Sequence, residues 1–135
     1  NGELAGRYLE VDLSQQKMYF FIDRALYKEY QISTGSEYPT PIGEYHILNK
    51  APLAWSGIYS VWMPYWMGFK YANDVGAYLG LHEIAYAVDE KGTPFYPRGN
   101  YIGDKMTGGC IAMAPGDARE VYNLSTVGML VRIVH

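Results

Sequence analysis

The sequence is short of the residues that build disulfides and metal sites. It holds a single cysteine in 135 residues, which excludes an intramolecular disulfide. Its three histidines are scattered along the chain. Because a protein metal site needs several cysteine, histidine or carboxylate ligands close together, we expect no metal and no other cofactor.

Long apolar runs and an excess of positive charge are also missing. A membrane-spanning helix needs about 18 or more consecutive apolar residues, and the chain has no such run, so we expect no span. The net charge of -3 argues against a nucleic-acid partner. The chain starts at Asn1 without Met and without a basic and apolar leader, which we interpret as a mature or excised domain whose targeting segment was removed.

The chain does have the length and the aromatic content of a small β-rich domain. At 135 residues it can bury a core of its own, so we expect one domain over 1–135. The sequence contains 14 tyrosines, and aromatic rings pack well on pleated sheets. A tyrosine-rich surface also suits sugars or extended peptides, and composition alone leaves both interpretations open.

Hydrophobic alternation and turn residues predict a mainly β fold. Residues 7–13 alternate between polar and apolar, which is typical of a half-buried strand. Short polar breaks then predict antiparallel neighbours. The further strands are expected over 17–22, 25–33, 44–48, 77–84 and 128–134. In the aromatic segment 55–69, Pro64 predicts edge strands or a bend.

Glycine and proline mark the irregular parts of the chain. Residues 34–43 and 89–109 are expected to be loops. The segment 115–124 predicts the one main helix, because Pro115 suits a first turn and Asp117 and Glu120 favour the positive end of the helix dipole. The expected architecture is a β-sandwich or barrel-like fold with this helix after the cysteine.

The most informative segment is Thr107-Gly108-Gly109-Cys110. Successive glycines allow positive φ and a close approach of the backbone to a ligand. Amides in such a turn can point at an oxyanion, as acyl-transfer chemistry requires. A glycine-rich turn leading into a buried cysteine gives the same sequence, so the pattern alone does not decide.

A catalytic thiol near neutral pH needs a basic neighbour. His135 is terminal and His46 lies within an expected strand, whereas His82 ends the apolar run Tyr78–Leu81. The loop that follows His82 is long enough to bring it to Cys110. The residues themselves leave His82 open as a base or as a core histidine.

Several motifs in this order resemble the L,D-transpeptidase catalytic domain, the YkuD family, from about Gly6 to Ile133. Residues 33–35 and 40–43 are similar to the family's STG and TPxG segments. Residues 63–65 resemble its MPY segment, His82 matches its catalytic histidine, and residues 107–110 match its S/T-H-G-C nucleophile motif.

The resemblance implies a β-sandwich-like enzyme of the cell wall that acts outside the cytoplasm, in the periplasm or the cell wall. Its partners would be peptidoglycan stem peptides, as donor and as acceptor, in cell-wall biogenesis and the maintenance of cell shape. Cys110 would attack the stem carbonyl and release D-Ala to leave a thioester, which an amine resolves. A carbapenem would form an adduct at Cys110.

The resemblance also implies roles for individual residues. His82 would be the base, oriented by the backbone carbonyl of Glu83, and the oxyanion donors would come from the backbone around residues 107–109 and from Cys110 itself. The side chains expected to line the donor stem are Met63, Tyr65 and Trp66.

Three positions depart from the family pattern. Gly108 replaces the motif histidine, Ala112 stands where arginine is common, and Glu83 stands where glycine or serine is common. Three alternatives therefore remain: an L,D-carboxypeptidase that uses the same thiol, a catalytically silent peptidoglycan-binding domain, and a sortase-type site completed by Arg98 or Arg119.

Overall fold

The computed structural model describes residues 2–135, so the expected domain start at Asn1 lies outside the described residues. The chain is mainly β, with one α-helix in this part of the sequence. None of the described helices is long and apolar enough to cross a membrane. The elements are η1 (Gly2–Ala5), β1 (Arg7–Asp12), β2 (Lys17–Ile22), β3 (Ala25–Ser33), β4 (Gly43–His46), β5 (Asn49–Ser56), β6 (Val61–Ala72), β7 (Ala77–Glu83), β8 (Ala87–Val88), β9 (Pro94–Phe95), β10 (Ile111–Met113), α1 (Asp117–Leu124) and β11 (Leu130–Val134).

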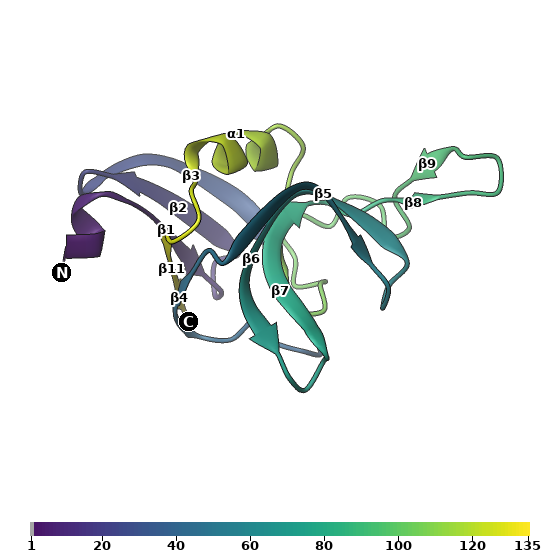
Figure 1. The fold of residues 1–135 in the computed structure, drawn as a ribbon, viewed down its shortest axis with the longest axis horizontal. Helices are drawn as coiled ribbons and strands as arrows, with labels where there is room; N and C mark the ends of the chain where they lie inside the picture. Colours follow the sequence, from purple (N-terminus) through teal and green to yellow (C-terminus); the bar gives the residue numbers. More distant parts are fainter. Residues whose placement is uncertain (1) are drawn as a thin grey trace.

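Nine strands form one curled sheet in the order β4-β11-β1-β2-β3-β10-β7-β6-β5 (Figure 1). The expected antiparallel pairing of β1, β2 and β3 is confirmed. Two pairs are parallel, β1 with β11 and β10 with β7. The second of these pairs joins the strand that follows Cys110 to the strand that carries His82, and so builds the site described below.

Two expectations about the strands were wrong or incomplete. The strand β5 was not expected, and Pro64 lies inside β6, between β5 and β7, although it was expected at an edge. The ladder between β6 and β7 begins only at Met67, so Pro64 removes no hydrogen bond from that side. The expected bend follows immediately, because Tyr65 has a φ of 55°.

The loop expected over 89–109 contains part of a small hairpin, and the helix begins later than expected. β8 and β9 pair with each other and project from the body of the molecule (Figure 1). Gly116 is the N-cap of α1 with a φ of 88°, so the preceding Pro115 stands outside the helix. A left-handed residue at the N-cap stops the helical backbone from extending to Pro115.

The core lies between the curled sheet and α1. Ala118 and Val121 of α1 are fully buried, and the helix packs against β6 and β7. The largest fully buried side chains, each removed from water by neighbours on several strands, are Phe20, Leu9, Met18, Ile32, Ile47, Met67, Leu81, Ile111, Met113, Leu130, Ile133 and Val11. This core fixes β7 and β10, which carry the candidate site.

One lysine stabilises the end of α1 from the neighbouring sheet. Lys50 on β5 donates from Nζ to the carbonyls of Tyr122 at 2.7 Å and Ser125 at 2.8 Å. It also lies 3.9 Å from the centroid of the Tyr122 ring. Because the last turn of α1 contains no basic residue of its own, Lys50 supplies the positive charge that the C-terminal end of the helix dipole favours.

Lys50→Met should therefore lower the free energy of unfolding by about 2 kcal/mol, since it leaves two helix-terminal carbonyls without their charged donor. Chemical denaturation would measure the change. The control is Lys17→Met, which removes a half-exposed lysine that lies 3.7 Å from Glu29, and which should cost less than about 1 kcal/mol. Equal losses in the two variants would contradict the capping role.

Candidate active site

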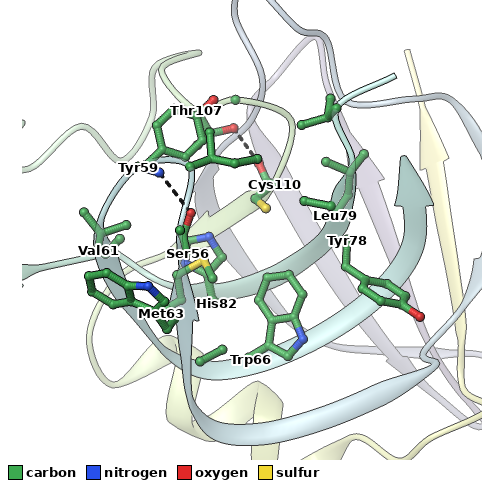
Figure 2. Close-up of a pocket in the computed structure, with 18 of the residues that line it drawn as sticks. Ser56, Tyr59, Val61, Met63, Trp66, Tyr78, Leu79, His82, Thr107 and Cys110 are labelled. Carbon is green, nitrogen blue, oxygen red and sulfur yellow. Dashed lines mark hydrogen bonds between the residues drawn. The ribbon is translucent and has the colours of Figure 1, made fainter. Parts of the chain in front are cut away.

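The sheet places Cys110 and His82 on the same face. Cys110 immediately precedes β10, in which Ala112 pairs with His82 of the parallel strand β7. Residues two apart in a strand point to the same side, so Cys110 and Ala112 share the face of His82. Figure 2 shows the sulfur of Cys110 and the ring of His82 in one cavity.

This cavity has a volume of about 520 Å³ and a largely apolar, aromatic wall. Three parts of the chain enclose it: the β5–β6 hairpin, β7, and the loop from residue 97 to residue 110. Among the residues that line it are Tyr59, Met63, Trp66, His82, Arg98, Thr107, Gly108 and Cys110.

His82 is held in one orientation. Its side chain is only 4% exposed, and Nδ1 lies 2.6 Å from the carbonyl oxygen of Glu83. Because a carbonyl only accepts, Nδ1 carries the proton and Nε2 is left as the acceptor. Trp66 stacks on the ring with centroids 6.0 Å apart and planes 20° from parallel. Glu83 therefore contributes its main chain at this position, which is the role that the resemblance implied.

Burial keeps both members of the pair neutral. Desolvation raises the pKa of Cys110 to about 11, although a backbone hydrogen bond with Gly80 opposes the rise. Desolvation lowers the pKa of His82 to about 4, against the opposing effect of the Glu83 carbonyl. The cavity thus holds a thiol and a neutral imidazole at rest, and a thiolate forms only when a proton moves to a base.

Residues 107–110 form the nucleophile loop, and the hydroxyl of Thr107 holds its two ends together. Thr107 Oγ1 donates to the carbonyl of Cys110 at 2.6 Å and accepts from the amide of Gly109 at 3.2 Å. Gly109 has the expected positive φ, at 119°. Its amide donates to Thr107 Oγ1, and the amide of Thr107 itself donates to the carbonyl of Thr34 at 3.0 Å. The amides of Gly108 and Cys110 remain the candidates.

Gly108 lies directly against the side chain of Tyr59, a contact that the sequence did not predict. A Cβ at this position would overlap the hydroxyl of Tyr59, from the tip of the β5–β6 hairpin. Arg98 holds the same region: it donates to the carbonyl of Met106 at 2.6 Å and lies 5.9 Å from the Tyr59 ring centroid. Tyr59 carries no motif signal, so sequence reasoning missed it.

The substrate-lining residues expected from the resemblance divide into two groups. Met63 and Trp66 line the cavity. Tyr65 does not, because its ring packs against Tyr122 of α1 with centroids 5.4 Å apart. The positive φ of Tyr65 interrupts the alternation that would have placed it with Met63, and its side chain turns toward the helix.

Of the other candidates, Arg98 lines the cavity with Cys110, and the rest lie elsewhere. His46 is on β4 at the far edge of the sheet order, and Arg119 is exposed on α1. Ala112, at the position where arginine is common, is fully buried in the sheet, where it pairs with Ser33 and His82. Within residues 2–135, no group of three or more His, Cys, Asp or Glu side chains is placed to hold a metal ion.

Comparison with known proteins finds one family. The model of the L,D-transpeptidase catalytic domain, YkuD, matches residues 6–133. No curated protein matches the chain.

Solved structures with the same fold include an L,D-transpeptidase from Stackebrandtia nassauensis, with 26% identity, a TM-score of 0.73 and coverage of 96% of this chain and 56% of that one. An L,D-transpeptidase from Mycobacterium tuberculosis H37Rv has 21% identity and a TM-score of 0.75, and the match covers 96% of this chain and 58% of that one. L,D-transpeptidase 3 from M. tuberculosis, with a faropenem-derived adduct, has 19% identity, a TM-score of 0.70 and coverage of 96% and 60%. The chain thus spans less than two thirds of each of these relatives.

Proposed function

Because the chain belongs to the L,D-transpeptidase catalytic domain family, we propose that it is a cysteine acyltransferase of peptidoglycan stem peptides. Cys110 is the nucleophile, His82 is its base, and the donor is a tetrapeptide stem that ends in D-Ala. The observation that carries the proposal is the pair itself: one cavity holds the only cysteine of the chain and a buried histidine whose Nδ1 is fixed by a carbonyl.

The first half of the reaction forms the thioester. The proton of Cys110 Sγ moves to His82 Nε2 as sulfur bonds to the carbonyl carbon of the stem residue before D-Ala. The carbonyl oxygen takes the negative charge, which backbone amides of the nucleophile loop stabilise. When the tetrahedral intermediate collapses, the C–N bond breaks and His82 returns the proton to the leaving amine of D-Ala.

The second half regenerates the thiol. An acceptor amine attacks the thioester carbonyl while His82 takes a proton from it, and the departing sulfur recovers that proton. Water as the acceptor gives hydrolysis by the same steps. Since the substrate is the cell wall, the proposal places the protein outside the cytoplasm, in the periplasm or the cell wall.

The neutral resting state suits this chemistry. A thiol of raised pKa reacts slowly with oxidants and alkylating reagents, because the thiolate is the reactive form. His82 with its lowered pKa is fully available as a base at neutral pH. The nucleophile is therefore generated only as the carbonyl is attacked.

Incubation with a carbapenem, followed by intact mass measurement, tests the proposal. The parent should gain one stoichiometric acyl adduct at Cys110, and Cys110→Ala should gain none. The faropenem-derived adduct of the M. tuberculosis relative supports the choice of a β-lactam probe. A folded parent that keeps a free thiol and gains no adduct would instead favour a peptidoglycan-binding domain without catalysis.

A further inference from the structure

The two carbonyls that flank the nucleophile are both held by threonine hydroxyls. Thr107 Oγ1 donates to the carbonyl of Cys110 at 2.6 Å, within the same loop. Thr40 Oγ1 donates to the carbonyl of Gly109 at 2.8 Å, from a segment 69 residues earlier in the chain. The second contact ties the nucleophile loop to a separate and well-fixed part of the fold.

Thr40 is itself rigidly placed. Its side chain is 2% exposed, and its hydroxyl accepts a hydrogen bond from the amide of Gly35 at 3.0 Å. A Cβ at Gly35 would overlap the carbonyl oxygen of Tyr38, so residues 35–40 form a tight turn that only glycine allows. The hydroxyl of Thr40 thus has one donor and one acceptor as partners, and its proton is directed at the loop.

The anchored carbonyl fixes the direction of the next amide. In a trans peptide unit the C=O and the following N–H point in opposite directions. Gly109 borders a smaller cavity of about 140 Å³ beside Pro39 and Pro41, whereas Cys110 borders the large cavity. A Gly109 carbonyl drawn toward Thr40 therefore turns the amide of Cys110 toward the large cavity.

We infer that Thr40 is a positioning residue that aims the Cys110 amide at the oxyanion formed during acyl transfer. The inference rests on the proposed function and extends it to a residue that touches neither sulfur nor substrate. Gly109, with its positive φ and no side chain, leaves the peptide unit between Gly109 and Cys110 free to rotate unless its carbonyl is held. Thr40 supplies that restraint.

Two reactions of the Cys110 thiol distinguish the positioning of the oxyanion donor from the activation of the sulfur. Alkylation by iodoacetamide forms no oxyanion, whereas acylation by a carbapenem does. Thr40→Val should leave the alkylation rate within about threefold of the parent and lower the acylation rate at least tenfold, since the removal of an oxyanion donor outright costs about 10²- to 10³-fold. Thr40→Ser, which keeps the hydroxyl, should restore the ratio of the two rates.

The matched control is Thr34→Val, which removes another buried threonine hydroxyl nearby. Thr34 Oγ1 accepts from Gln16 Nε2 at 2.7 Å and does not touch residue 109, so the variant should change stability without changing the rate ratio. Thermal unfolding would verify that each variant is folded, and Thr40→Ala would replace Thr40→Val if the latter does not fold.

The outcomes separate the two proposals. Acylation of the parent supports the proposed function, and an unchanged ratio in Thr40→Val or Thr40→Ala would then overturn the inference alone. If the parent resists the carbapenem, the proposed function fails, and p-nitrophenyl acetate serves as the acyl donor for the same comparison of rates. A ratio that falls equally in Thr34→Val would show a general packing effect and would also overturn the inference.

Discussion

His82→Gln should lower the rate of Cys110 acylation by about 10³-fold, because it removes the group that accepts the thiol proton and returns it to the leaving amine. With the pKa of Cys110 raised to about 11, unassisted ionisation at pH 7 yields about one thiolate in 10⁴ molecules. Glutamine approximates the size of histidine, so the packing of Trp66 is largely kept.

Stopped-flow measurement of carbapenem acylation would give the ratio of rates between the parent and His82→Gln. His46→Gln is the control, because it changes the same residue type at an exposed position on β4, outside the cavity, and should leave the rate unaltered. A rate in His82→Gln within fivefold of the parent would make His82 a packing residue only, and the base would have to be sought elsewhere.

The parent should also lose about 3 kcal/mol of stability between pH 7 and pH 4 through His82 alone. The pKa of His82 is near 6.5 in the unfolded chain and about 4 in the folded chain. As the pH falls below 6.5, the unfolded chain binds a proton that the folded chain refuses, so unfolding becomes easier. The loss grows until the pH reaches the folded pKa and then levels off.

Denaturant unfolding of the parent and of His82→Gln at several pH values isolates this contribution. The difference in unfolding free energy between the two proteins should change by about 3 kcal/mol over the interval. Glu83, whose pKa is raised by burial, titrates in both proteins and cancels in the comparison. A constant difference from pH 7 to pH 4 would show that His82 has the same pKa in the folded and the unfolded chain, as a freely hydrated imidazole does.

The sequence predicted the strands best where turn residues bound them. Residues 17–22 and 25–33 were expected with the boundaries that β2 and β3 have, although the first five residues of β3 are exposed. β5 was missed because its residues are intermediate or exposed, so its pattern carries little hydrophobic alternation. The length of β6 was hidden by Pro64, which is accommodated only because β7 does not pair with that part of β6.

The sequence predicted those site residues that belong to recognisable motifs, and it did not predict the others. Local sequence placed Cys110 after a glycine turn and His82 at a strand end, and the parallel pairing of β10 with β7 joins them. The role of Thr40 was not predictable, because its contact with Gly109 depends on how two distant loops meet. Tyr65 was expected in the cavity with Met63, two residues earlier, but its positive φ breaks the strand alternation and its ring packs against Tyr122 of α1.

The close approach of Tyr59 to Gly108 couples the shape of the cavity to the residue at position 108. A side chain there would meet the Tyr59 hydroxyl, which is the far end of a half-exposed side chain, so the tyrosine would swing aside to admit it. Because Tyr59 lines the cavity, that movement would widen the wall opposite Cys110 without disturbing the sheet. A single substitution at residue 108 thus remodels the entrance to the cavity through a side chain on another hairpin.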